Sequence, residues 1–94
     1  MKETVSFELG EKKYVCISVK SYCGAFDVTE AKYTLKKGKE IEESGDCKIE
    51  QRSDTETILS ALIQPMAKNA TYTLEYTYEI PPEILIHEIR VTVC

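Results

Sequence analysis

The ten residues TYTLEYTYEI, at positions 71–80, decide the fold class of this chain. Apolar or aromatic side chains occupy every second position from Tyr72 to Ile80, and threonine or glutamate occupies each position between them. A period of two is typical of a β-strand that has one face in a core and the other in water. Similar alternation occurs on both sides of this stretch, so the sequence predicts an antiparallel all-β domain.

Shorter alternating segments surround this strand. They are separated by turn residues such as Gly10, Gly38 and the triplet 44–46, and Pro81-Pro82 stops the central strand because proline donates no ladder hydrogen bond. About seven strands at short intervals, without an internal repeat, predict a two-sheet sandwich or small barrel that forms a single domain over residues 1–94. The other segments predicted as strands or short arms are 4–9, 15–19, 26–36, 39–43, 47–51 and 84–94.

The segment 55–64 fits two structures. Its apolar residues fall at helical spacing, Ser53 with Glu56 matches a capping box, and Pro65 would end a helix. Against a helix, several of its residues are β-branched, and the segment lies between clear strands. Periodicity alone does not assign so short an apolar run, and we favour a strand.

Strand parity predicts which side chains form the core. Tyr72, Tyr76 and Tyr78 share one face of one strand, and we favour core packing with their hydroxyls at the rim. The alternative is an exposed aromatic platform suited to a partner protein or a sugar. The expected core contains Val15, Ile17, Val19, Tyr33, Leu35, Leu62, Tyr72, Leu74, Tyr76, Ile89 and Val91.

The last segment, 84–94, carries apolar residues on both parities. Leu85 and Ile89 share one face, whereas Ile84 and Ile86 share the other. We expect either that both faces are covered where this strand begins, or that a β-bulge shifts the pleat by one residue.

Composition argues against several classes of partner. The formal net charge is −4 with both signs mixed along the chain, whereas a nucleic-acid interface needs a basic face. The basic cluster at 36–39 is followed at once by glutamates, so we interpret it as a solvated hairpin tip. We find neither a signal peptide nor an apolar run of the ~20 residues that span a bilayer. We therefore expect no nucleic-acid or membrane partner, and a cytoplasmic location at synthesis.

Four cysteines, Cys16, Cys23, Cys47 and Cys94, match no zinc-binding spacing because no C-x-x-C pair is present. A disulfide framework would need an oxidising compartment. Strand parity places Cys16 and Cys94 away from the core. We therefore predict free thiols that bind no metal.

No catalytic constellation emerges from the residue pattern. His87 is the only histidine, and we interpret it as a partly buried structural residue. Glu42 and Glu43 are adjacent, and neighbouring residues of a strand point to opposite faces, so they cannot form a glycosidase pair. All the glycines are isolated, so no phosphate-binding loop exists. We predict a non-enzymatic protein with no cofactor, no metal, no catalytic residue and no small-molecule substrate.

Residues 69–74, Asn-Ala-Thr-Tyr-Thr-Leu, resemble the entry to strand F of immunoglobulin-like sandwiches. There a small residue stands two positions before a tyrosine that folds back as the tyrosine corner, and Ala70 and Tyr72 match this pattern. Leu74 takes the place of the family's core cysteine, and the chain has no tryptophan, so the inter-sheet disulfide is not implied. The resemblance implies an immunoglobulin-like antiparallel two-sheet sandwich of about seven strands.

The longer pattern over 14–94 is similar to small immunoglobulin-like modules in virion proteins of bacteriophages and prophages. It comprises a charged hairpin, a short arm, an apolar strand, a turn, the sequence TYTL and a last strand. This resemblance implies a structural or adhesion module that acts by self-association or docking, with incorporation into a virion. The alternative is a small cytoplasmic regulator or inhibitor that binds one protein partner through an acidic edge.

The expected partner contact uses the hairpin at 32–43 or the edge of the terminal strand, because sandwich domains present loops and edges to partners. An equally good explanation of the hairpin charges is that they protect an edge strand from aggregation. The candidate contact residues are Lys36, Lys39, Glu40, Glu42, Glu43, Arg90 and Thr92.

Overall fold

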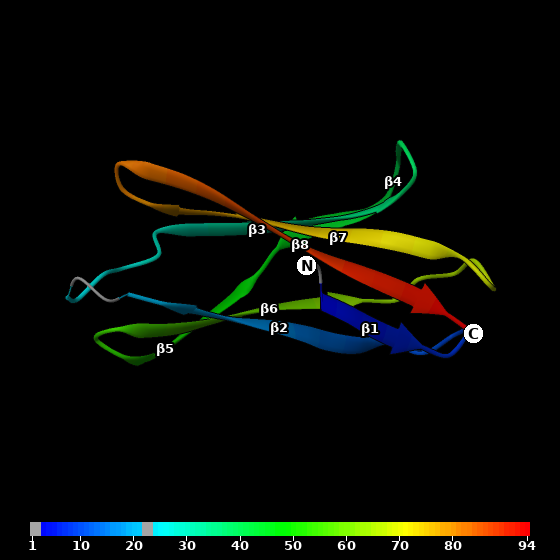
Figure 1. Ribbon diagram of the computed structural model, residues 1–94, viewed down its shortest axis with the longest axis horizontal. Coiled ribbons are helices and arrows are strands. Elements are labelled where there is room, and N and C mark those ends of the chain that lie inside the picture. Colours follow the sequence, from blue (N-terminus) through cyan, green and yellow to red (C-terminus); the bar gives the residue numbers. More distant parts are fainter. Residues whose placement is uncertain (1–2, 22–23) are drawn as a thin grey trace.

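Figure 1 shows two layers of strands in the computed structural model, which describes residues 3–21 and 24–94. These residues form eight strands and no helix: β1 (Glu3–Phe7), β2 (Lys13–Lys20), β3 (Glu30–Lys37), β4 (Glu40–Asp46), β5 (Lys48–Ser53), β6 (Glu56–Ile63), β7 (Thr71–Ile80) and β8 (Glu83–Val93). One sheet has the strand order β1-β8-β7-β3-β4, and the other has the order β2-β6-β5. The predicted all-β fold is confirmed, including the strand at 55–64.

One strand pairing departs from the antiparallel prediction. β1 pairs with β8 in parallel, with Glu3 opposite Ile89 and Phe7 opposite Val93, whereas every other pairing among the described strands is antiparallel. The reason is that β1 and β2 are consecutive but lie in different sheets. No hairpin links β1 to its neighbour in the sheet, so nothing forces an antiparallel direction.

The core lies between the two sheets and is built from their inward-facing rows. Most of the predicted core is buried, but Tyr33 and Leu62 are only partly so. Leu62 lies opposite Tyr14 on the outer face, because Leu59, Ala61 and Ile63 are the residues of β6 that point inward. The buried apolar residues are Phe7, Val15, Ile17, Val19, Ala31, Leu35, Cys47, Leu59, Ala61, Ile63, Tyr72, Leu74, Tyr76, Ile89, Val91 and Val93.

The turn predicted at 44–46 is wrong, because these residues are the last part of β4. Gly45 lies opposite Tyr33, and a Cβ atom at this position would stand 3.3 Å from the Tyr33 ring. The glycine therefore makes room for an aromatic ring rather than for a turn. β4 ends at Asp46, and the chain crosses to the other sheet at Cys47. The amide of Cys47 still donates to the carbonyl of Ala31 at 2.9 Å.

Neither expectation for the start of β8 holds. The register between β7 and β8 is continuous from Ile80 opposite Glu83 to Thr71 opposite Thr92, so no bulge shifts the pleat. Ile84 and Ile86 are not covered either, since they are 66% and 63% exposed. Two large apolar side chains therefore lie in the open on the outer face of the five-stranded sheet.

Tyrosine hydroxyls link the two sheets. The Tyr76 hydroxyl of β7 donates to the carbonyl of Val15 in β2 at 2.5 Å, and the Tyr33 hydroxyl of β3 donates to the carbonyl of Leu62 in β6 at 3.2 Å. Packing of Tyr72, Tyr76 and Tyr78 against the core is confirmed. The expected position of the hydroxyls at the rim is wrong for Tyr76, which is fully buried and finds its acceptor inside the sandwich.

We predict that Tyr76→Phe lowers the free energy of unfolding by about 1–3 kcal/mol, because it leaves a buried carbonyl without this donor. Urea unfolding measures this change. As a control, Tyr14→Phe, at a side chain 57% exposed, should change the free energy of unfolding by less than about 0.5 kcal/mol.

Burial raises the pKa of Tyr76. The folded state therefore holds this proton more tightly than the unfolded chain, and stability should fall as the pH rises above about 10. Tyr76→Phe should flatten that fall, and equal slopes in both proteins would contradict this account.

The three described cysteines, Cys16, Cys47 and Cys94, are free thiols, and Cys16 and Cys94 face outward as predicted. Cys23 lies outside the described residues. Burial, and then the charge of Asp46, raises the pKa of the Cys47 thiol to about 11.

We predict that in a Cys23→Ser variant at pH 8 a disulfide reagent modifies Cys16 and Cys94 quickly and Cys47 much more slowly, because the thiolate is the reacting form. Unfolding the variant should make all three equally reactive, and the unfolded wild-type chain should yield four thiols. If Cys47 in the folded protein reacts as fast as Cys16, its burial is not what controls its chemistry.

Candidate functional site

The outer face of the five-stranded sheet carries the most distinctive surface of the molecule. Strand pairing arranges its side chains in cross-strand rows over β3, β7 and β8. At the end near the β7–β8 turn, one row holds Glu30, Glu79 and Ile84, and the next holds Lys32, Thr77 and Ile86. We call these six residues the outer-face patch. It combines two exposed isoleucines with charges of both signs.

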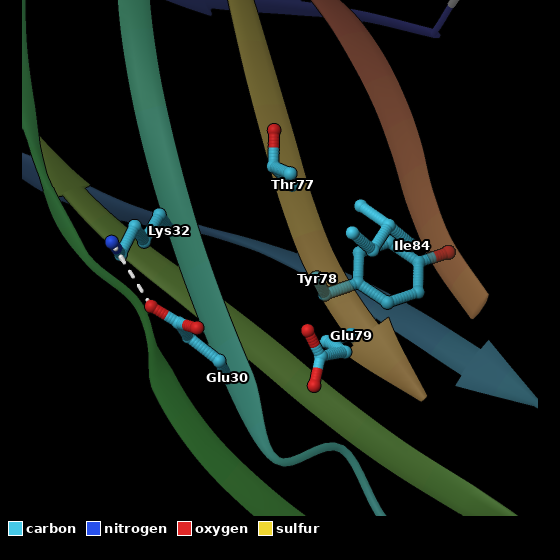
Figure 2. Close-up of a pocket in the computed structure, with 6 residues that line it drawn as sticks. All are labelled: Glu30, Lys32, Thr77, Tyr78, Glu79 and Ile84. Carbon is cyan, nitrogen blue, oxygen red and sulfur yellow. Dashed lines mark ion pairs between the residues drawn. The ribbon is translucent and has the colours of Figure 1, made fainter. Parts of the chain in front are cut away.

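A hollow of about 160 Å³ lies at the Ile84 end of this patch, and Figure 2 shows the side chains that line it. It is lined by Glu30, Lys32, Thr77, Tyr78, Glu79 and Ile84. The Lys32 ammonium pairs with the Glu30 carboxylate at 3.0 Å, and this contact raises the pKa of Lys32. The hydroxyl of Thr29 donates to the Glu79 carboxylate at 3.2 Å. The hollow is therefore bordered by carboxylates whose positions neighbouring side chains fix.

The structure brings together two of the predicted contact residues that lie far apart in the sequence. Lys36 on β3 and Arg90 on β8 both lie beside Thr73 of β7, on the same outer face as the patch. The Lys36 ammonium stands 3.6 Å from the carboxylate of Glu75. Thr92 is one row further along β8, where its hydroxyl lies 3.3 Å from that of Ser6. These three predicted residues thus form the opposite, more basic end of the same face.

Two other predicted contact residues, Glu42 and Glu43, have a structural role. A β-bulge in the β3–β4 ladder lies at Glu42, where the register shifts between Leu35 and Lys36. The bulge overturns the expectation that adjacent residues point to opposite faces, because both carboxylates bind the connection between β6 and β7. Glu43 accepts from the amide of Gln64 at 2.9 Å.

Glu42 completes this arrangement. One of its oxygens accepts from the Tyr72 hydroxyl at 3.0 Å, and the other accepts from the amide of Met66 at 3.3 Å. The Tyr72 hydroxyl in turn accepts from the amide of Ala67 at 3.0 Å. Burial is the main cause that raises the pKa of Tyr72, and the Glu42 carboxylate adds to it. Lys39 and Glu40, the remaining predicted residues, are exposed at the hairpin tip.

His87 is partly exposed, and its ring meets that of Tyr76 edge to face at a centroid distance of 6.5 Å. Its Nε2 atom lies 3.9 Å from the Glu3 carboxylate. Within residues 3–21 and 24–94, no group of three histidine, cysteine or acidic side chains is arranged to hold a metal ion. In the same part of the chain, no helix is long and apolar enough to cross a bilayer.

Sequence reasoning missed the outer-face patch, although a signal for it was present. Ile84 and Ile86 break the polar alternation expected of an outward row, and the sequence alone suggests a bulge or a covered face as the cause. Their neighbours Glu30 and Lys32 come from a strand more than fifty positions earlier. Only the sheet order could bring them to the same surface.

Comparison of the chain with protein-family models, with curated protein sequences and with solved structures finds no match.

We predict that Glu42→Ala and Glu43→Ala each lower the free energy of unfolding by about 1 kcal/mol, because amide and hydroxyl donors lose a charged acceptor. Glu40→Ala removes an exposed carboxylate from the same strand and should change stability by less than about 0.5 kcal/mol. Thermal or urea unfolding compares the three variants. Equal effects would mean that the hydrogen bonds to residues 64–67 add nothing to stability. Contact tests on this hairpin are therefore cleaner at Lys39 and Glu40.

Proposed function

We propose that this protein is a non-enzymatic structural or adhesion module that docks on another protein through the outer face of its five-stranded sheet. The observation that carries the proposal is the exposure of Ile84 and Ile86 side by side on β8, at 66% and 63%. Adjacent exposed apolar side chains rimmed by charged residues are typical of protein interaction surfaces. The surrounding glutamates, lysine and threonine supply such a rim.

We further propose that the fold is immunoglobulin-like. The sheet order β2-β6-β5 corresponds to strands B, E and D of that fold, and β8-β7-β3-β4 corresponds to G, F, C and C′. The first strand differs from that of constant-type immunoglobulin domains, because β1 pairs with the last strand rather than with β2. The strand order supports the resemblance that residues 69–74 first indicated.

Tyr72 gives independent support for an immunoglobulin-like fold. It stands two residues before Leu74, near the start of β7, and its hydroxyl binds the backbone amide of Ala67, five positions upstream. A tyrosine corner has this position and this backbone contact. The fully buried Leu74 fills the place that a cysteine holds in antibody domains.

The surface chemistry indicates what kind of partner fits. Glu79 lies opposite Ile84 and beside Glu30 in the same cross-strand row, and Glu88 follows Ile86 on the same face of β8. A matching surface therefore presents an apolar side chain next to lysine or arginine. A neighbouring subunit in a phage or prophage virion is the setting that the sequence resemblance favours.

The docking proposal is tested with the double variant Ile84→Ser, Ile86→Ser. Co-purification and then titration calorimetry measure binding to the products of adjacent genes. The affinity should fall by about tenfold or more, because the complex loses two apolar side chains that it would bury. The melting temperature should hardly change, since both side chains are exposed in the free protein.

Ile49→Ser is the matched control, because Ile49 is a 41% exposed isoleucine on β5, in the other sheet. It should leave binding unchanged. The proposal fails if the double variant binds as tightly as the wild type. The virion setting fails separately if the adjacent genes encode no capsid or tail protein.

A further inference from the structure

The two open sheets leave four edge strands, and the described structure protects three of them. β4 carries the bulge at Glu42, and β5 has a register shift between Gln51 and Ser53. Every residue of β5 is also exposed, and Lys48, Glu50 and Arg52 alternate in charge along one face of the strand. In the described part of the chain, β1 is five residues long. Bulges, charges and shortness are the features by which native sheets discourage pairing at an edge.

β2 has none of these features. It is an edge of the three-stranded sheet and pairs with β6 over eight residues without a shift. The six residues 14–19 carry no charge, and charges stand only at Lys13 and Lys20. Lys13 is already engaged, because its ammonium donates to the carbonyl of Ser6 at 2.9 Å and pairs with Glu11 at 3.2 Å. Within the part of the chain that the structure describes, no strand covers the other edge of β2.

We propose that this edge of β2 pairs with the same edge of a second copy of the chain. The two β2 strands run antiparallel, and the two three-stranded sheets become one six-stranded sheet. Strand addition of this kind provides main-chain hydrogen bonds along the whole edge. The proposal does not depend on the outer-face patch, which lies on the other sheet.

A two-fold axis through the joined sheet places one residue of β2 opposite its own equivalent. With Cys16 on the axis, Lys20 lies opposite Lys12 of the second copy, and like charges directly opposite are unfavourable. With Ile17 on the axis, Val15 lies opposite Val19 and Cys16 opposite Ser18 of the second copy. Tyr14 then lies opposite Lys20, with no like charges paired. An axis at Val15 or at Ser18 also avoids like charges, but it pairs only five residues of β2, whereas the axis at Ile17 pairs the seven residues 14–20. Charge and the length of the paired segment together therefore favour the register centred on Ile17.

This pairing closes on itself, because each copy uses its one unprotected edge and the protected edges remain outside. The contact is nevertheless small. Eight residues of strand span about 27 Å, and a single edge buries less than the ~800 Å² per partner of a typical stable complex. We therefore expect a weak dimer that forms at high protein concentration.

The test uses two double variants that differ only in the sign of the charge at position 16. In this register, position 16 of each copy lies opposite position 18 of the other. Cys16→Glu with Ser18→Lys therefore forms two pairs of opposite charge across the axis, whereas Cys16→Lys with Ser18→Lys forms two pairs of like charge. Sedimentation from about 1 µM to about 1 mM should show dimerisation at least tenfold tighter in the first variant than in the second. Equal affinities, or a wild-type protein that stays monomeric over the whole range, would overturn the proposal.

Cross-linking tests the register without introducing charge. In a Cys23→Ser, Cys94→Ser background, Ser18→Cys should give a covalent dimer under mild oxidation, through the native Cys16 of the second copy. Lys20→Cys is the matched control. It should give no covalent dimer, because Tyr14 of the second copy, and not a cysteine, lies opposite position 20. Ser60→Cys should give an internal disulfide instead, since the Ser60 hydroxyl lies 3.2 Å from the Cys16 thiol. A covalent dimer in the background protein itself, or equal yields for Ser18→Cys and Lys20→Cys, would refute this register.

Discussion

Hydrogen bonds from the hydroxyls of core-facing tyrosines to backbone carbonyls hold this sandwich in register. A hydrophobic layer by itself is not directional, and it tolerates sliding of one sheet over the other. The hydroxyls of Tyr76 and Tyr33 fix two carbonyls, in β2 and β6, at set positions above β7 and β3. The chain has no tryptophan, and its described cysteines are free, so these rings supply both bulk and direction. The partial burial of Tyr33, and Gly45 beneath its ring, belong to the same arrangement.

The connection between β6 and β7 depends on a second polar arrangement. Residues 64–67 leave the ladder, and the amides of Gln64, Met66 and Ala67 need acceptors that a regular edge strand of the opposite sheet would not provide. The bulge at Glu42 turns two consecutive carboxylates toward them, and Tyr72 joins the same group. The bulge in β4 thus supplies hydrogen-bond acceptors to the β6–β7 connection and also makes this edge strand irregular. The charged hairpin that first resembled a contact site is, in part, a support for its own fold.

The sequence predicted the parts of this structure that depend on local periodicity. Alternation in 71–80 fixed the buried row of β7, and the β-branched residues of 55–64 correctly favoured a strand over a helix. The errors occurred where partners distant in sequence decide the outcome. An apolar run has no parity of its own, so the sequence predicts Leu62 wrongly as a core residue. It predicts a turn at Gly45 because the partner of this glycine, Tyr33, lies twelve positions earlier in the chain. The predicted contact residues were found on two surfaces, and the exposed pair Ile84 and Ile86 was recognised only as an irregularity.

The parallel pairing of the first and last strands has a mechanical consequence. β1 begins beside Ile89 and ends beside Val93, so its leading end and the trailing end of β8 lie at opposite ends of one ladder. A tension applied through these two ends pulls the strands past each other along their length. The ladder bonds are then loaded together in shear, whereas a hairpin pulled at its open end loses them one at a time. A chain held in this way between two neighbours would resist extension until the whole β1–β8 seam yields at once.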